Sequence, residues 1–432
     1  MESRRTRSTE GLMGSNWNAS LTSLRPLAGV RVLSMEQAAA LPFATRHLAD
    51  LGADVIRVQS HKRPAPDTYD IEFTRNKRQL AIDLAAPGGP DVFRRVAAAC
   101  DVVCHNFTPQ VVRKFGIDYE SLRALRPDLI YLELTGFGTT GPWRARPLFG
   151  PGAEALSGHN LLIGAPDRWP GRPATITYAD NNCGLYAVLA LTDALARKDR
   201  LGVGSHLDIS LYETAVSQLG PALAERGLSA MPERNLNDDA AFAVQGSYPS
   251  ADPSQYVALS VPHGAAAAAA GALGAAAGAA DDLAAAIAAQ PADHAVAALQ
   301  AAGIPAAVVA DAAALATDEH LWARGYFGLL QRDDHGLDGQ YAYSGPPFGG
   351  GADVTMRAAR PVGADSREIL ASVAGYPAEE IDQLFAVGAI GTGAPPGRTG
   401  PGADSATRID RGELSRVDPG FRERLAAAQD RR

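Results

Sequence analysis

Short apolar strands alternate with helices along the first third of the chain, and this alternation restricts the fold more than any other feature. Strands are predicted at 29–33, 53–58, 79–84, 101–104 and 129–134, and helices at 41–51, 88–99 and 119–125. Two parallel strands need a crossover about as long as a helix. The repeated strand–helix–strand order therefore predicts a doubly wound parallel sheet of the α/β class.

The segment after Ser247 has a different amino-acid composition. A strand is predicted at 256–261, and residues 265–302 are dominated by alanine with two short helices. Few bulky side chains are available there, so we expect a small separate lobe with a modest core. Strand and turn patterns then resume, and the last predicted helices lie at 366–373 and 377–385.

The two ends of the chain have the composition of unstructured segments. Arginines among Ser, Thr and Asn predict a disordered tail over residues 1–25, and no apolar segment of an export signal follows them. Residues 391–432 are rich in Gly, Pro and charge, which predicts a mobile tail.

The overall charge is mildly acidic. The 432 residues carry 48 acidic and 40 basic side chains, a net charge of −8, which argues against broad binding to nucleic acid or an anionic membrane. No apolar run is long enough to cross a membrane without Gly, Pro or charge. Three cysteines suit a reducing cytoplasm, where we expect the protein. Neither Cys100-x3-Cys104 nor the nine histidines have metal-ligand spacing, so no metal site is expected.

Asp180 stands shortly before an apolar stretch, 185–195, that predicts a helix buried on all sides. A lone Asp before a helix is most often an N-cap that binds free amide groups of the first turn. The alternative is a carboxylate nucleophile, kept ionised at the positive end of the helix and directed at a bound carbonyl. The local sequence leaves both interpretations open.

Two other catalytic patterns fail on their context. Residues 136–141 match the G-x-G-x-x-G loop of nicotinamide dehydrogenases, but Pro147 prevents the helix that must follow, and no acidic strand end lies about 20 residues on. Ser205, His206 and Asp208 have the residue types of a hydrolase triad. On a strand, however, Ser205 points away from the other two side chains, so an ordinary strand is expected.

Eight short motifs, taken in order, resemble the class III CoA-transferase family, which includes the carnitine and formyl-CoA transferases and the 2-methylacyl-CoA racemases. They read GVRVL at 29–33, LGADVI at 51–56, RNKRQLAIDL at 75–84, DVVCHNF at 101–107, GFGTTGP at 136–142, DxxxG at 180–184, GVGSHLDIS at 202–210 and AGIP at 302–305. Each motif alone is weak, but the ordered set is specific, and the resemblance covers about residues 26–390.

The resemblance implies a particular organisation of domains. A large Rossmann-like domain is built from both chain ends, 26–225 and 326–390, and a small α+β domain is inserted at 240–325, here shortened and rich in alanine. Two ring-shaped subunits are threaded through each other in an interlocked homodimer, a rare exception to unlinked topology.

The resemblance also implies a reaction. In this family the Asp of the DxxxG motif takes the acyl group of an acyl-CoA as a mixed anhydride, and Asp180 occupies that position. CoA then forms an aspartyl-CoA thioester, which a small carboxylic acid attacks. A carboxylate suits this exchange, because a serine ester would be too stable to reform a thioester. CoA is thus a substrate, and no permanently bound cofactor is expected.

The same resemblance places CoA against several loops of the large domain. Asn106 would supply hydrogen-bond donors and acceptors, Phe107 a stacking face and Lys114 a charge for a phosphate. Taken singly, Phe107 also fits a core position and Lys114 a solvated face. The implied contacts are Ala39, Ala40, Ile82, Asp83, Leu84, Ala85, Asn106, Phe107, Thr108, Lys114, Phe149 and Gly150.

Three local sequences depart from the family pattern. An aromatic residue followed by an acid is here Phe149-Gly150, so we expect a weakened acceptor half-reaction that Gly150→Asp restores, provided that the backbone angle φ of Gly150 tolerates Asp. A basic residue after the second strand is Ser60, although the His-Lys-Arg sequence at 61–63 can replace it. A Gly-Glu-His-type motif is Gly-Ala-Asp-Ser at 363–366.

Two other functions remain open on the sequence. A 2-methylacyl-CoA racemase uses the same fold with a His and the Asp as opposed acid and base, but residues 149–154 contain no histidine. The reduced small lobe suggests a non-catalytic protein that binds CoA thioesters. Exchange of labelled CoA would favour the transferase. Deuterium uptake at the α-carbon would favour the racemase, and binding of CoA thioesters without either reaction would favour the non-catalytic protein.

Overall fold

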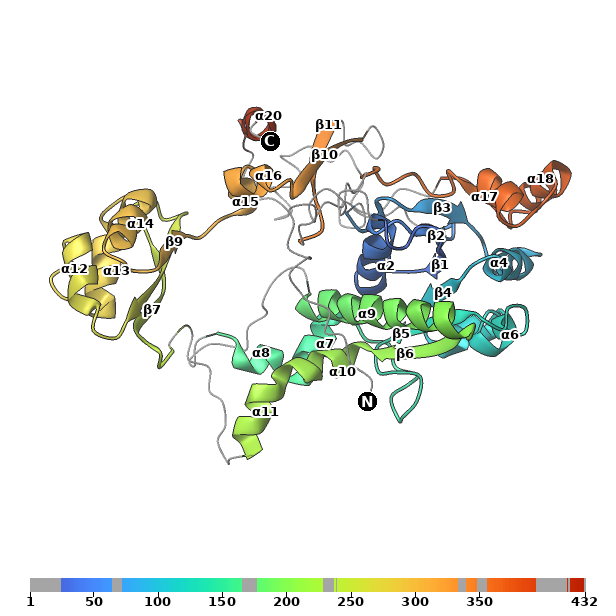
Figure 1. Ribbon diagram of the computed structural model, residues 1–432, viewed down its shortest axis with the longest axis horizontal. Helices are drawn as coiled ribbons and strands as arrows, with labels where there is room; N and C mark the ends of the chain where they lie inside the picture. Colours follow the sequence, from blue (N-terminus) through green and yellow to red (C-terminus); the bar gives the residue numbers. More distant parts are fainter. Residues whose placement is uncertain are drawn as a thin grey trace, which may run out of the picture.

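A six-stranded parallel sheet forms the centre of the larger part of the molecule (Figure 1). The computed structural model describes residues 25–63, 72–164, 177–227, 237, 239–332, 339–347, 356–393, 418 and 420–430. The strands are β1 (Arg31–Met35), β2 (Asp54–Gln59), β3 (Arg78–Ala81), β4 (Val102–His105), β5 (Ile130–Thr135) and β6 (Ser205–Ser210). Their order, β3-β2-β1-β4-β5-β6, is the doubly wound order, and the crevice at its switch point opens between β1 and β4.

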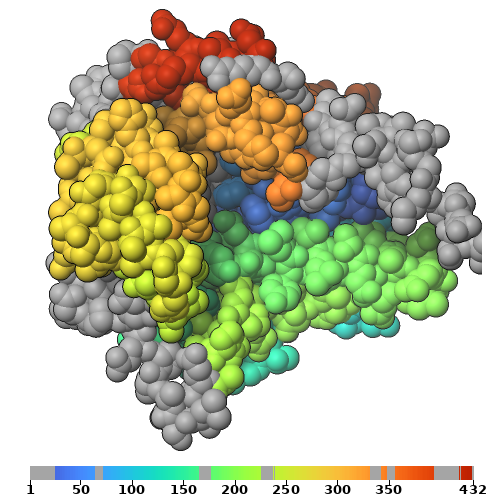
Figure 2. Space-filling view, turned by 60° about the vertical axis from the view of Figure 1, so that its left-hand side comes forward, coloured from blue at the N-terminus to red at the C-terminus, as the bar shows by residue number. Residues whose placement is uncertain are grey.

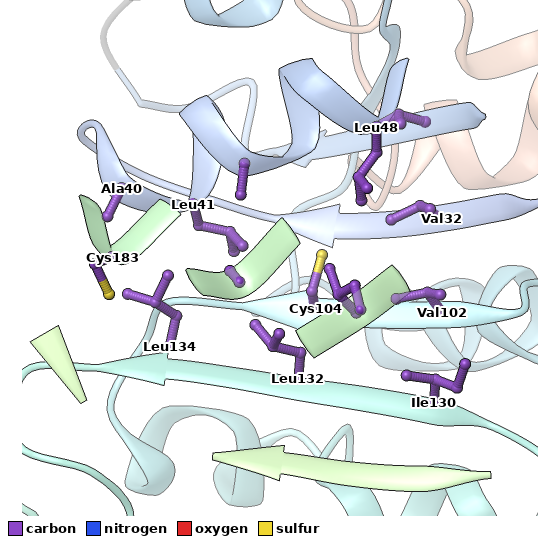
Figure 3. Close-up of a cluster of buried hydrophobic side chains, with 14 of the residues drawn as sticks. Val32, Ala40, Leu41, Leu48, Val102, Cys104, Ile130, Leu132, Leu134 and Cys183 are labelled. Atoms are coloured by element: carbon purple, nitrogen blue, oxygen red, sulfur yellow. The ribbon is translucent and has the colours of Figure 1, made fainter. Parts of the chain in front are cut away.

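Helices cover both faces of this sheet. Val32, Val102 and Ile130 point to one face and pack against α2 (Ala40–Asp50) and α9 (Tyr178–Leu201); Figure 3 shows this cluster. The alternate residues of the same strands join the core on the other face. That face is covered by α4 (Gly89–Ala98), α5 (Pro109–Lys114) and α6 (Tyr119–Arg123). The predicted α/β class with a parallel sheet is confirmed, although α5 was not predicted.

The C-terminal part of the chain returns to the outer edge of this sheet. It contributes α17 (Ser366–Ser372) and α18 (Ala378–Ala386). The backbone N–H of Gln79 donates to Asp365 Oδ2 at 2.8 Å, and that of Ala81 donates to Ser366 Oγ at 3.0 Å. These bonds occupy donors at the edge of β3 that would otherwise be unpaired. Segments from the N-terminal and C-terminal parts of the chain therefore pack together at this sheet.

The small domain lies apart from the parallel sheet, at the left of Figure 1. Its antiparallel sheet contains β7 (Phe242–Pro249), β8 (Tyr256–Pro262) and β9 (Ala306–Val308). One core joins this sheet to three helices, α12 (Ala266–Leu273), α13 (Ala280–Ala288) and α14 (Ala292–Ala301). The alanine-rich stretch thus forms three helices instead of the two that were predicted.

The remaining elements connect these parts. After β5 come α7 (Gly150–Ser157) and α8 (His159–Leu162), and after β6 come α10 (Leu211–Val216), η2 (Ser217–Leu219) and α11 (Gly220–Gly227). After the small domain follow α15 (Ala312–Ala316), α16 (Glu319–Ala323), β10 (Phe327–Arg332), β11 (Gly339–Ser344) and finally α20 (Phe421–Gln429). In the tail expected over 391–432, α20 packs Leu425 near Trp322. Residues 1–24 and 394–417 lie outside the described residues.

The N-cap interpretation of Asp180 and the expectation that α9 is buried on all sides are both wrong. The helix begins at Tyr178 with Thr177 as its N-cap residue, so Asp180 is in the first turn and is not the N-cap. It is also not buried on all sides: Leu185, Tyr186 and Leu189 are 51%, 44% and 65% exposed, and Figure 2 shows α9 (green) at the surface. The sheet and α2 cover only one side of it. No helix of the described residues, the 24-residue α9 included, is long and apolar enough to span a membrane.

The opposite side of α9 approaches α2 very closely at Gly184. A Cβ atom there would lie 2.7 Å from the carbonyl oxygen of Ala40 and 2.9 Å from Cδ1 of Phe43. Neither group can move freely, because the first is backbone and the second belongs to a packed ring. Gly184 therefore sets the distance between the first turns of the two helices.

We expect Gly184→Ala to lower the free energy of unfolding by about 1–3 kcal/mol, the usual cost of overpacking. The matched control is Gly220→Ala, where a Cβ meets nothing within 4 Å and the backbone is already helical; it should be neutral or stabilising by up to about 1 kcal/mol. Urea unfolding followed by circular dichroism measures both. Equal stability of the two variants would contradict the close approach.

Candidate active site

A groove of about 410 Å³ lies at the carboxyl ends of the strands, around the switch point of the sheet. In open α/β sheets this is where ligands bind. The lining comes from the end of β1 and the loop after it (35–38), from the end of β2 and Ser60 (57–60), and from the loop after β3 (82–85). Arg63, Phe107, Val111 and Phe115 complete it. Ala38 has a φ of 54°, which is uncommon for a residue with a side chain and marks a constrained turn before α2.

Five of the predicted CoA contacts line this groove, namely Ile82, Asp83, Leu84, Ala85 and Phe107. The others lie around it or elsewhere. Ala39 and Ala40 are buried at the start of α2, and Thr108 is the N-cap residue of α5. Lys114 is exposed, with its Nζ 5.3 Å from the ring centroid of Phe115. Contact of these residues with CoA stays a prediction.

The Asn106 side chain is used within the protein. The N–H of Gln37 donates to Asn106 Oδ1 at 2.9 Å, and Asn106 Nδ2 donates to the carbonyl of Gln37 at 2.7 Å. This pair of bonds ties the loop after β4 to the loop after β1 across the switch point. Asn106 therefore holds two walls of the groove together.

Positive charge gathers at one side of the groove. Lys62 Nζ lies 2.5 Å from Asp83 Oδ2, and this hydrogen bond is the main reason why the pKa of Asp83 is lowered. The Arg63 guanidinium lies 5.7 Å from the ring centroid of Phe107, within cation–π range. The 61–63 segment thus supplies the cations that Ser60 lacks.

A buried ion cluster lies beneath the groove. Glu36, which lines it, is 3.3 Å from Arg57 and 2.6 Å from Lys77. Burial raises the pKa of Glu36, but the charges of Lys77 and Arg57 outweigh it and the net pKa is lowered. Burial lowers the pKa of Lys77 to about 8. The cluster connects the loop after β1 with β2 and with the segment before β3.

Asp180 lies at the start of α9, 8% exposed, beside the start of α7. The hydroxyl of Thr177, 5% exposed, donates a hydrogen bond to Asp180 Oδ2. In the first turn of a helix, the partial positive charge of the N-terminus favours an ionised carboxylate. The helix terminus thus favours the ionised form that a nucleophile needs, and the Thr177 hydroxyl fixes the orientation of the carboxylate.

Gly150 has no room for a side chain. A Cβ built on it would overlap Asp180 Oδ2 and Thr177 Oγ1 and lie 2.6 Å from Thr177 Cβ. Its φ is outside the left-handed region, so steric clearance and not backbone strain favours glycine here. An aspartate at residue 150 would therefore require the Asp180 and Thr177 side chains to move, and restoration of the acceptor half-reaction by Gly150→Asp stays a prediction. Phe149 next to it is 68% exposed.

Glu154, one turn further along α7, is fully buried. Its Oε1 accepts a hydrogen bond from the N–H of Ala179 at 3.3 Å, and its Oε2 has no hydrogen-bond partner among the described residues. Glu154 thereby binds an amide group at the start of α9 that the N-cap side chain leaves open.

The groove and Asp180 are connected through α2. Gly184, one turn after Asp180, contacts Ala40 at the start of α2, and residues 37–38 just before α2 line the groove. Thr177 and Glu154 were not among the predicted site residues. The spacing Thr177-x-x-Asp180 resembles a capping box with Asp in place of Glu, a signal that predicts Thr177 as the N-cap. Nothing local marks Glu154.

Comparison with known proteins identifies the family. The model of CoA-transferase family III matches residues 27–366. The chain belongs to this family. It is 36% identical over 205 residues to the β subunit of succinyl-CoA–L-malate CoA-transferase of Chloroflexus aurantiacus, covering 45% of this chain and 51% of that protein. It is 34% identical over 246 residues to the succinyl-CoA–D-citramalate CoA-transferase of the same organism, covering 54% and 61%.

The sequence match to curated relatives covers only part of each chain, whereas the structural match to a solved protein covers more of this chain. The chain spans about half the length of the curated relatives it matches. The crystal structure of a CAIB/BAIF family protein from Brucella suis superimposes with a TM-score of 0.71 at 27% identity. The superposition covers 81% of this chain and 99% of the Brucella suis protein. The two proteins therefore share a fold over most of the length of each.

His105 supports the wall of the groove from below. Its Nδ1 accepts the N–H of Phe107 at 3.3 Å, and its Nε2 lies 3.6 Å from Glu133 Oε2. Burial lowers the pKa of His105 from 6.5 to about 4, since the nearby Glu133 compensates only in part. Folded His105 is therefore neutral at neutral pH, as an acceptor at Nδ1 must be.

We expect the free energy of unfolding to fall as the pH drops from about 6.5 to 4, because the unfolded chain then gains a proton at His105 that the folded chain does not. One such histidine contributes at most about 1.4 kcal/mol per pH unit. His105→Gln should flatten this slope in urea unfolding series, whereas the exposed His294→Gln should leave it unchanged. Parallel slopes for all three proteins would contradict the assignment.

Proposed function

We propose that this protein transfers CoA from an acyl-CoA donor to a small carboxylic acid, with Asp180 as the covalent nucleophile. The observation that carries the proposal is a carboxylate in the first turn of α9, hydrogen-bonded by Thr177 and connected through α2 to the groove. Membership of CoA-transferase family III supports the same reaction.

The reaction is proposed in four steps that consume no proton. An Asp180 oxygen attacks the thioester carbonyl, the C–S bond breaks, and CoA thiolate leaves a mixed anhydride. The thiolate attacks Cγ of Asp180, and the donor acid departs as a carboxylate. The acceptor carboxylate attacks Cγ of the aspartyl-CoA thioester and expels the thiolate. The thiolate then attacks the acceptor carbonyl and regenerates Asp180.

The groove is the proposed binding place of CoA. Its walls supply apolar surface from Ile82 and Phe107, and Arg63 with Lys62 supplies charge for phosphate groups. CoA is a substrate in this scheme, with no bound cofactor. The described cysteines, Cys100, Cys104 and Cys183, are buried free thiols, which supports the proposed cytoplasmic location.

Asp180→Ala should abolish transfer while acyl-CoA binding remains, because only the nucleophile is removed. Asp193→Ala, a change to an exposed acid on the same helix, should transfer like the wild type. The donor panel begins with succinyl-CoA, tested with L-malate and D-citramalate, because the names of the relatives pair these compounds. Chromatography of the CoA esters gives the rate, and calorimetry gives the binding.

Three outcomes separate the proposed function from its alternatives. Substantial transfer by Asp180→Ala would remove Asp180 from the mechanism. Deuterium uptake at the α-carbon of a 2-methylacyl-CoA without transfer would indicate a racemase. Binding of CoA thioesters by the wild type with neither reaction would indicate a non-catalytic binding protein.

We also propose a homodimer, as the family resemblance implied. The exposed Leu185, Tyr186 and Leu189 form an apolar surface on α9 that a second copy of the chain would cover. Light scattering should give twice the 45.1 kDa chain mass. Leu189→Glu should reduce the dimer fraction, whereas Leu125→Glu, at an exposed leucine after α6, should not. A wild type with the mass of one chain would contradict the proposal.

A further inference from the structure

The hydroxyl of Thr177 has an unusual partner for an N-cap residue. An N-cap Thr ordinarily accepts a hydrogen bond from an amide of the first turn. Thr177 makes no such bond; its Oγ1 instead donates to Oδ2 of Asp180, and both side chains are buried. A donor is therefore directed at one particular oxygen of the proposed nucleophile.

A neighbouring helix takes over part of the capping. Glu154 Oε1, on α7, accepts the N–H of Ala179 in the first turn of α9. The start of α7 also encloses the Thr177–Asp180 pair, since Gly150 lies where any Cβ would overlap both side chains. The Thr177–Asp180 hydrogen bond is thus held in a buried, enclosed place where little water competes for it.

From this geometry we infer that the Thr177 hydroxyl is a catalytic oxyanion donor for the two steps in which Asp180 Cγ is attacked. The inference rests on the function proposed above. With Oδ2 bound to Thr177, the attack on the acyl-CoA uses Oδ1. In the resulting anhydride Oδ2 is the carbonyl oxygen of Asp180, and Thr177 still faces it.

The charge on Oδ2 then decides which steps need Thr177. When CoA thiolate attacks Cγ, the electron pair of the Cγ=Oδ2 bond moves onto Oδ2, and the tetrahedral oxyanion collapses by breaking the Cγ–Oδ1 bond. The acceptor acid attacks the same carbon, and the C–S bond breaks. In the first and last steps the oxyanion forms on the substrate carbonyl instead. Thr177 therefore acts in the second and third steps.

Two isotope exchanges separate these steps. Labelled CoA enters unlabelled acyl-CoA through the first step and its reversal, whereas labelled donor acid enters acyl-CoA only if the second step also occurs. Thr177→Val removes the hydroxyl at nearly constant shape. It should slow the acid exchange about 100-fold or more, the usual effect of losing one oxyanion donor. The CoA exchange should stay the same or rise, because Asp180 loses a donor that weakens its nucleophilicity.

Thr177→Ser retains the hydroxyl and should restore the acid exchange. Thr177→Ala replaces the valine variant if thermal unfolding shows that valine is not tolerated. A disturbed structure would lower both exchanges together, so the ratio of the two rates reports the hydroxyl itself.

The possible failures are distinguishable. A wild type that catalyses neither exchange overturns the proposed function and this inference with it. A wild type that catalyses both, with a valine variant whose two rates keep the wild-type ratio, overturns the role of Thr177 and leaves the transferase function standing.

Discussion

The contact between α9 and α2 at Gly184 is the constraint on which the rest of the site depends. Two helices rarely approach so closely that the backbone of one contacts the other without an intervening side chain, and glycine makes this approach available here. Because α2 begins beside the groove and α9 begins beside Asp180, the contact joins the two places where a ligand and a nucleophile are expected. A wider helix spacing would separate them.

A glycine also makes a close helix contact possible at the start of α9. Gly150 lets α7 approach the Thr177–Asp180 pair, and this approach brings Glu154 to the open amide of Ala179. The glycine at residue 150 and the acid at residue 154 are therefore parts of one packing arrangement. A side chain at residue 150 would displace those of Thr177 and Asp180.

The apolar residues on the outer side of α9 do not pack on the sheet, unlike those on its inner side. Cys183, Ala187 and Leu191 pack on the sheet, whereas Leu185 and Leu189 face away from it. A helix that is apolar all round needs a second surface to cover its outer side. Within one chain no described element does so, and in the proposed homodimer a second copy would.

The sequence by itself determined the α/β class, most strand positions, the separate alanine-rich lobe and the family, because strand alternation and ordered motifs are local patterns. Through the family resemblance, the sequence also pointed to residues 82–85 and Phe107, which line the groove. Only the tertiary structure decided that Asn106 is bound to Gln37 and that Gly150 is confined by the side chains of Thr177 and Asp180. These facts are distances between segments far apart in the chain, and such distances depend on how whole helices pack.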